Sequence, residues 1–192
     1  ITSGDGDDAF PRILLTNSHD GMQAFKFSVG IFRLVCSNGL VVADEQFSDF
    51  KIKHKGYTFG ELRKVVRQAV EDLPNKVQIM NDMKNRILTR DEKNKLALDA
   101  MLIRAGVAPG SEQAEAFNYD DETIDDILDP KRDADKGDDL WRVFNVVQEK
   151  ITQGDFHAAL TGAKVRKVRK IKSFEKDIKV NKELFKLATA LV

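Results

Sequence analysis

The spacing of apolar residues changes near residue 58, and this change constrains the fold most strongly. Before residue 58, apolar residues form short runs that favour β-strands, and Phe25, Phe27 and Val29 alternate with polar residues. After residue 58, apolar residues recur at helical spacing. The pattern predicts an α+β fold, with a small antiparallel sheet in the N-terminal half packed by several amphipathic helices.

The strands of this sheet are expected in five short runs rich in β-branched or aromatic residues: 12–18, 24–30, 31–37, 39–43 and 49–55. Asp20-Gly21 and Asn38-Gly39 would supply hairpin turns, because glycine and asparagine reach positive φ at little cost. The last run alternates apolar residues with lysines. One face of that strand would therefore carry Lys51, Lys53 and Lys55.

The rest of the chain should be mainly helical. One long amphipathic helix is expected from Thr58 to Leu88, with a kink at Pro74. Thr89, with Glu92 three residues later, forms a capping box for a second helix, which Gly106 and Pro109 should stop, so residues 58–106 should be a helical hairpin. Two further helices are expected over residues 138–153 and from Ile178 to the C-terminus, with a basic β-ribbon between them.

Length and composition are consistent with one folded domain. The chain has 192 residues, 42% of them hydrophobic, which is enough to bury a core. Residues 1–11 are rich in Gly and Asp and should form a flexible arm. The remainder, 12–192, is expected to be a single α+β domain: a mainly β part (12–57), the helical hairpin (58–106), an exposed acidic connection (107–136) with at most a short helix from Thr123 to Leu128, and a final helix, basic ribbon and helix (137–192).

Charge and cysteine content exclude several classes of protein. Lys and Arg number 31, as do Asp and Glu, so attraction to an anionic partner depends on local clusters of charge. The single Cys36 cannot form an internal disulfide and fits a reducing compartment. No apolar run approaches the ~18 residues of a membrane-spanning helix, so no membrane partner is expected. The chain begins at Ile1 without a signal-like segment, which suggests a fragment.

The basic segment, residues 164–172, is the strongest functional signal in the sequence. It contains no acidic residue, and its cations are interleaved with Val165, Val168 and Ile171. Such a concentration of positive charge is typical of phosphate binding. Its six cations are Lys164, Arg166, Lys167, Arg169, Lys170 and Lys172.

Two interpretations of the basic segment stay open. Joined to the lysine face at residues 51–55, it would form a positive surface for a single nucleic-acid strand, with Phe47, Phe50 and Tyr57 stacking against bases. Alternatively, it is a solvent-exposed ribbon whose charges serve solubility or pair with acidic residues within the fold. The first interpretation predicts function, and the second only structure.

The acidic segment, residues 120–139, carries ten carboxylates. A solvated loop is one interpretation, and imitation of a nucleic-acid backbone is another. The segment lacks the ligand spacing and the glycine of a calcium-binding loop. Asp138 and Asp139 lie where a helix should begin, so they are expected to stabilise its positive end.

The residues around Cys36 also allow two interpretations. A Cys–His pair oriented by an amide is an established catalytic arrangement, so Cys36 with His19 would serve a hydrolase. Alternatively, Asp20 and Asn38 belong to hairpin turns, and Cys36 is a small buried hydrophobic residue. No paired spacing of His or Cys indicates a metal site, and no cofactor is expected.

Several motifs carry a family resemblance, namely "SHDG", "GIFRLVCSNGL", "GDDLWRVFNVVQEKITQG" and "KVRKVRKIKSFEKDIKVNKELFKLA". They resemble the phage- and plasmid-like protein family known as domain of unknown function 932, from about Arg12 onward. The resemblance implies a gene carried by phages, prophages or plasmids, lacks established catalytic residues, and suggests that longer members have an additional N-terminal region. The matching residues are Ser18, His19, Asp20, Gly21, Arg33, Cys36, Asn38, Asp139, Leu140, Trp141, Phe144, Asn145, Gln148, Asn181 and Leu184.

The resemblance favours a structural role for the residues around Cys36. Polar groups near a predicted core need hydrogen-bond partners. We therefore expect a polar, hydrogen-bonded hub that joins the sheet to the helix containing Trp141. Its members would be His19, Asp20, Arg33, Asn38, Asn145 and Gln148.

Three functions follow, in this order of preference. The first is a nucleic-acid-binding protein of a phage or plasmid that binds single-stranded DNA in replication or recombination, acts as a homo-oligomer, and works in the cytoplasm of a bacterial host cell. The second is an interaction protein that inhibits a host defence or transcription factor through the acidic segment. The third is the Cys36–His19 hydrolase, which slow, ordinary thiol alkylation would count against.

Overall fold

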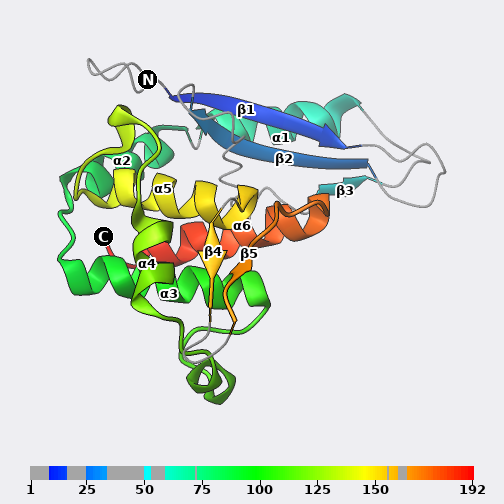
Figure 1. Ribbon diagram of the computed structural model, residues 1–192. Helices are drawn as coiled ribbons and strands as arrows, with labels where there is room; N and C mark the ends of the chain where they lie inside the picture. Colours follow the sequence, from blue (N-terminus) through cyan, green and yellow to red (C-terminus); the bar gives the residue numbers. More distant parts are fainter. Residues whose placement is uncertain are drawn as a thin grey trace. The chain divides into compact units, whose positions relative to one another are not determined.

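The computed structural model describes residues 9–16, 25–33, 50–52, 59–71, 73–154, 156–159 and 164–192. It is mostly helical, with small antiparallel sheets (Figure 1). The chain divides into two compact units, Ile1–Ile79 and Met80–Val192, and each is described by itself. The single domain expected over residues 12–192 stays a prediction, as does the packing of helices on the N-terminal sheet.

The first unit contains the antiparallel sheet that the alternation of apolar residues predicts. Its strands β1 (Ala9–Thr16), β2 (Phe25–Arg33) and β3 (Phe50–Ile52) lie in the order β1-β2-β3. The β1–β2 register runs from Ala9 opposite Arg33 to Thr16 opposite Lys26. The strand β2 covers parts of two runs that were expected as separate strands, 24–30 and 31–37.

The strand β1 begins earlier than the sequence suggests, because residues 9–11 of the expected flexible arm belong to it. Pro11 is compatible with this position, since β1 is an edge strand of the described sheet and a missing N–H there need not break a ladder hydrogen bond. Residues 1–8, the expected strand at 39–43 and both expected hairpin turns lie outside the described residues.

Over the range expected to be one helix, Thr58 to Leu88, the structure describes two helical segments. They are α1 (Phe59–Glu71) and α2 (Leu73–Asn85), and Pro74 lies in the first turn of α2. Proline is tolerated there because the first N–H groups of a helix have no partner within it, whereas it disfavours helical backbone in the residue before it. Asp72, between the two segments, lies outside the described residues, so the kink expected at Pro74 stays a prediction.

The second unit contains the remaining helices and a two-stranded ribbon. Its elements are α3 (Arg90–Ala105), η1 (Glu112–Ala116), α4 (Asp121–Leu128), η2 (Asp133–Asp135), α5 (Leu140–Gln153), β4 (His157–Ala158), β5 (Arg166–Lys167) and α6 (Phe174–Thr189). The expected acidic connection at 107–136 is more than a connection, because α4 packs against α3 and α5. Its residues Thr123, Ile124 and Ile127 are buried.

The helix α3 begins and ends where the sequence predicts. The Thr89 hydroxyl accepts a hydrogen bond from the Glu92 N–H, and the Glu92 carboxylate accepts one of 2.8 Å from the Thr89 N–H. Gly106 ends the helix at φ 84°, a left-handed conformation that glycine adopts without a steric penalty. The capping box and the stop are therefore confirmed.

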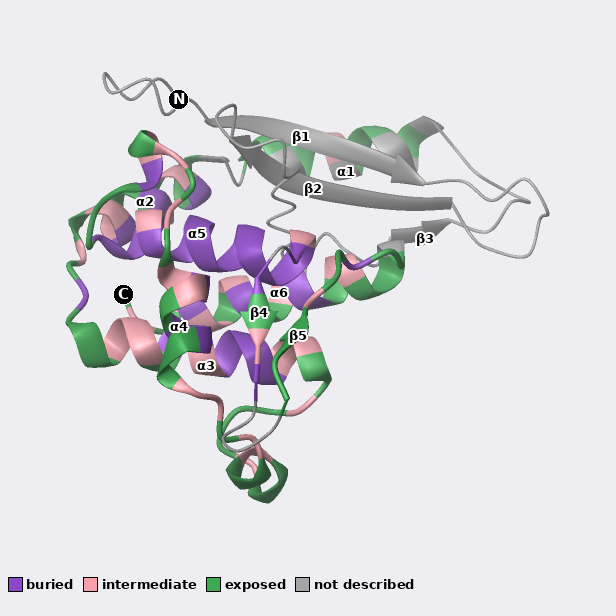
Figure 2. Ribbon diagram, in the orientation of Figure 1, coloured by how far each residue is buried: buried purple, intermediate pink, exposed green. Residues whose placement is uncertain are grey.

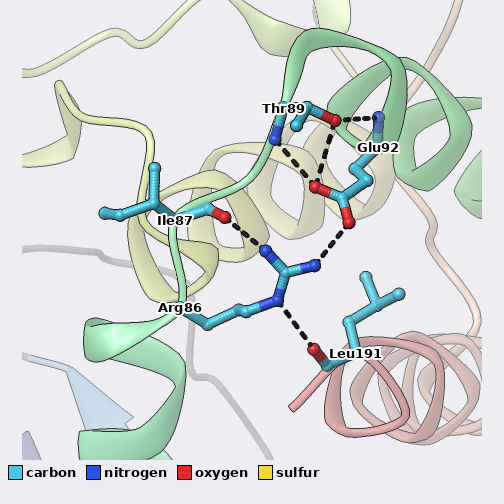
Figure 3. Close-up of polar contacts among 5 residues, drawn as sticks. All are labelled: Arg86, Ile87, Thr89, Glu92 and Leu191. Carbon is cyan, nitrogen blue, oxygen red and sulfur yellow. Dashed lines mark hydrogen bonds and ion pairs between the residues drawn. The ribbon is translucent and has the colours of Figure 1, made fainter.

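Arg86 links this helix start to the end of the chain (Figure 3). Its guanidinium donates to the Glu92 carboxylate and to the Ile87 carbonyl, and its Nε donates to the Leu191 carbonyl over 3.2 Å. The hydrogen bond from Thr89 and the interaction with Arg86 both lower the pKa of Glu92. One side chain thus joins the α2–α3 connection to the segment that follows α6.

The helix α5 forms the centre of the second unit. It packs against α3, α4 and α6 and is buried along most of its length (Figure 2). Trp141 and Phe144 are among the largest fully buried side chains. A helix buried on most sides must also satisfy its polar groups, because an unpaired buried polar group is costly.

Candidate nucleic-acid interface

The basic segment lies between the β4 strand and the α6 helix (Figure 1). Its residues Arg166 and Lys167 form β5, which pairs antiparallel with β4, Lys167 opposite His157 and Arg166 opposite Ala158. The sequence predicts a ribbon before the last helix, and the structure contains a short one here.

The cationic side chains of the basic segment are exposed to solvent. Val165 is 53% exposed, whereas Ile171 is 8% exposed. One apolar side chain therefore anchors the segment while the charged ones surround it. The exposed cations are Lys164, Arg166, Lys167, Arg169, Lys170 and Lys172.

Hydrogen bonds to its main chain hold the basic segment in place. The N–H of Val168 donates to the Phe156 carbonyl over 2.8 Å, and the N–H of Ile171 donates to the Thr152 carbonyl over 2.9 Å. The guanidinium of Arg104 donates to the Arg169 carbonyl. These contacts fix the backbone without using any side chain of the six cations.

Gly154, directly after α5, lets the basic segment approach closely. Its φ is 71°, and a Cβ there would lie 2.6 Å from the Arg169 carbonyl carbon and 2.7 Å from the Val168 oxygen. Contacts that short with backbone atoms require the chain to move. Glycine is therefore required at this position for both its conformation and its size.

Asp126 of α4 anchors the other strand of the ribbon. One carboxylate oxygen accepts from the His157 N–H over 3.0 Å, and the other accepts from Lys150 Nζ over 2.9 Å. Burial alone would raise the pKa of Asp126, but these two partners outweigh it and lower the pKa. The β4 strand is thereby tied to α4 and α5.

Lys170 of the basic segment also interacts with a carboxylate. Burial raises the pKa of Asp177 in the first turn of α6, and the positive charge of Lys170 opposes that rise. The net direction is upward, so burial is the larger effect. Asp177 therefore offsets part of the positive charge near the C-terminal end of the basic segment.

Most carboxylates of the acidic segment have partners within the second unit. Asp120 caps α4 by accepting from the Thr123 N–H over 2.8 Å, and Asp139 caps α5 by accepting from the Arg142 N–H over 3.0 Å. The segment also forms ion pairs: Asp125 with Arg90, Asp126 with Lys150, Asp133 with Lys136, Asp135 with Arg132, Asp138 with Lys93, and Asp139 with Arg142. Three of these pairs, Asp125–Arg90, Asp126–Lys150 and Asp138–Lys93, join α4 or the start of α5 to another helix, and the other three are local.

The predicted polar hub is described only in part. Asn145 Nδ2 donates to the Trp141 carbonyl over 2.7 Å, and Gln148 Nε2 donates to Asn181 Oδ1 of α6 over 2.6 Å. Both side chains are buried and bonded, as expected of polar groups in a core. Arg33 ends β2, while His19, Asp20 and Asn38 lie outside the described residues. The link from this hub to the sheet stays a prediction.

The predicted lysine face is likewise described only at Lys51. This residue lies in β3, opposite Lys26 of β2, and Phe50 lies opposite Phe27. Lys53, Lys55, Phe47, Tyr57 and the pair Cys36 and His19 lie outside the described residues. The joint surface of this face and the basic segment stays a prediction.

Sequence reasoning did not single out two residues that shape the interface, Arg104 and Gly154. Arg104 is a basic residue in the last turn of α3, a position that also suits the helix dipole. Gly154 follows the last turn of α5. Both positions carry helix-end signals, but neither signal indicates contact with a segment further along the chain.

None of the helices described is long and apolar enough to cross a membrane. Within the same part of the chain, no three His, Cys, Asp or Glu side chains gather as metal ligands would.

Comparisons with known proteins identify the family. The family described as "Domain of unknown function (DUF932)" matches residues 1–185. The chain belongs to this family. It is 29% identical over 191 residues to the UPF0380 protein YafZ of Escherichia coli strain K12 and 28% identical over 187 residues to the UPF0380 protein YfjQ of the same strain.

Each alignment covers 95% of this chain but 63% of the relative. The chain therefore spans less than two thirds of the length of these curated relatives. No solved structure matches the chain. The names of the family and of these relatives state no activity, so function has to be argued from the residues.

Proposed function

We propose that this protein binds nucleic acid through the basic segment, with a preference for single-stranded DNA. The observation that carries the proposal is the combination of six exposed cations with a fixed backbone. Six like charges within nine residues repel one another, so holding them in one arrangement opposes folding. A polyanion would relieve that repulsion.

The physical basis of such binding is the release of counterions. Each Lys or Arg that neutralises a phosphate releases condensed cations from the nucleic acid, so affinity falls as salt rises. The slope of log affinity against log salt is about 0.7 per phosphate for a single strand. The basic segment offers up to six such contacts.

The preference for a single strand is the finer part of the proposal. It depends on Phe47, Phe50 and Tyr57, which would stack against unpaired bases near the lysine face. We propose that the protein acts in replication or recombination of a phage or plasmid within the cytoplasm of a bacterial host. Assembly into homo-oligomers would allow cooperative coverage of the strand.

The second hypothesis, an inhibitor that imitates DNA through the acidic segment, has less support than nucleic-acid binding. A mimic needs carboxylates that face solvent and a partner, whereas Asp126, Asp135 and Asp139 are engaged in ion pairs within the fold. The hydrolase hypothesis concerns Cys36 and His19 and keeps its own test, the rate of thiol alkylation.

The test is fluorescence-anisotropy binding of a labelled 30-nucleotide strand and of the matching duplex, across a series of salt concentrations. The proposal predicts tighter binding of the single strand, weakening steeply with salt. A variant with four segment cations changed to Ala should lose most of the affinity, with a slope lower by roughly 3. The changed residues are Lys164, Arg166, Lys167 and Arg169.

The matched control removes the same charges elsewhere. Two arginines and two lysines that are exposed outside the basic segment are changed to Ala, and this variant should keep most of the affinity. The control residues are Arg67, Arg90, Lys95 and Lys136. Absence of binding at low salt, or equal losses in both variants, would contradict the proposal.

A further inference from the structure

Arg104 connects three segments of the second unit. It lies in the last turn of α3, and its guanidinium donates to the Ile151 carbonyl in α5 and to the Arg169 carbonyl in the basic segment. Arg104 and Arg169 are 65 residues apart in the chain. A single side chain therefore ties the basic segment to two helices.

The surroundings of Arg104 fit this role. The guanidinium is partly buried, so it loses part of its hydration, and this burial lowers its pKa. Two carbonyl oxygens replace the lost water, and a guanidinium can serve both because its donors are arranged in a rigid, planar fork. Lysine offers a single ammonium group and cannot match that geometry.

The contact of Arg104 falls between two other anchors of the basic segment. The N–H groups of Val168 and Ile171 donate to the Phe156 and Thr152 carbonyls, on either side of Arg169 in the sequence. In these two hydrogen bonds the donor belongs to the basic segment. In the third, the donor is the guanidinium of Arg104 in α3, and the basic segment supplies the acceptor, the Arg169 carbonyl. The backbone of residues 168–171 is thus held through both donors and acceptors.

We propose that Arg104 is a positioning residue for phosphate binding. It holds residues 168–171 in one conformation, so that the exposed cations around them keep a fixed spacing before a ligand arrives. This inference rests on the proposed function. Its basis is that a preorganised site loses less conformational entropy on binding than a mobile one.

The effect of Arg104 can be separated from a direct phosphate contact by the salt dependence of binding. Arg104→Gln should weaken binding of the 30-nucleotide strand by about fivefold through lost preorganisation, with an unchanged salt slope. Arg166→Gln should instead lower the slope by about 0.7, because it removes a phosphate contact. Arg104→Lys should recover part of the lost affinity.

A matched control lies on the same helix. Arg90→Gln removes the same charge from α3, where Arg90 pairs with Asp125 at the surface, and it should change neither affinity nor slope. A slope reduced by Arg104→Gln as much as by Arg166→Gln would show that Arg104 contacts phosphate directly and would overturn the positioning role. Equal affinity of Arg104→Gln and wild type would overturn it too.

Hydrogen exchange tests the same inference without nucleic acid. The amides of Val168 and Ile171 should exchange faster in Arg104→Gln than in wild type or Arg90→Gln, while amides in the middle of α5 keep their protection. Unchanged exchange at these two amides would overturn the positioning role. Faster exchange in a protein that binds no nucleic acid would support the anchoring by Arg104 and refute the proposed function instead.

Discussion

The acidic segment and the basic segment lie in the same unit but use their charges in opposite ways. Carboxylates of the acidic segment cap α4 and α5 and pair with cations from other helices. Cations of the basic segment stay exposed, while its main chain is held by hydrogen bonds. The difference makes the basic segment, whose six cations are all exposed, a better candidate binding surface than the acidic segment, where Asp126, Asp135 and Asp139 are drawn into ion pairs within the fold.

The largest loss of stability should come from Asp126→Ala. This change leaves the buried ammonium of Lys150 without its carboxylate and frees the His157 N–H, so the free energy of unfolding should fall by about 3 kcal/mol. Urea denaturation measures the change, with Glu122→Ala on the same helix as an exposed control. A loss no larger than that of the control would show that the acidic segment does not hold the fold.

Gly154→Ala should lower the free energy of unfolding somewhat less, by about 2 kcal/mol. The new methyl group would meet the backbone of Arg169, and the φ of 71° is strained for alanine. The same denaturation experiment measures the loss. Gly110→Ala also has a positive φ, of 76°, but open space around it, so it separates the cost of φ from the cost of the contact. Equal losses of unfolding free energy in the two variants would show that the close approach of Gly154 to Arg169 contributes nothing.

Asp139→Ala should cost about 1.5 kcal/mol, because it removes the cap of α5. The cap accepts from the Arg142 N–H, and the carboxylate also pairs with the Arg142 guanidinium over 2.7 Å. Asp139→Asn should recover part of the loss, since asparagine is also a good cap. If asparagine recovers none of it, the ion pair with Arg142 and not the cap is what matters.

A smaller effect should follow from protonating two carboxylates of the acidic segment, Asp120 and Asp138. The side-chain hydrogen bond from Thr123 lowers the pKa of Asp120, and that from Lys93 lowers the pKa of Asp138. A depressed folded-state pKa contributes stability that is present above the unfolded value of about 3.9 and is lost as pH falls through the folded pKa.

Urea midpoints between pH 6 and pH 2 measure this acid dependence. The double variant Asp120→Asn and Asp138→Asn should lose less stability than wild type over the same fall in pH. An unchanged acid dependence in the double variant would mean that these two contacts do not favour the folded state.

The smallest effect on stability should come from the basic segment itself. Arg166→Gln with Lys170→Gln should change the free energy of unfolding by less than about 0.5 kcal/mol, because exposed charges contribute little. The same substitutions should weaken DNA binding markedly. A large loss of stability would instead place these cations among the interactions that hold the fold.

Elements defined by local chemistry could be predicted from the sequence. Thr89 and Glu92 cap α3 through neighbours in the chain, and Gly106 ends the same helix in a left-handed conformation. The antiparallel pairing of the first two strands also follows from a local pattern. Such features depend on residues a few positions apart.

Contacts between distant segments could not be predicted in this way. Asp138 pairs with Lys93 across 45 residues, and Arg104 reaches Arg169 across 65. The packing of helices decides which carboxylates find a cation, and no local pattern shows it. The basic segment was predicted as a candidate site from its composition alone, but its anchors were not.

The most direct test of the central claim is to cross-link the protein to a single strand carrying photoreactive bases and to map the attached peptides. Cleavage after acidic residues would release the basic segment within a fragment of residues 156–175, which mass spectrometry can identify. We predict that this fragment carries the main cross-link and that excess unlabelled DNA removes it. Cross-links concentrated on other fragments, or none at all, would contradict the assignment of the basic segment as the binding surface.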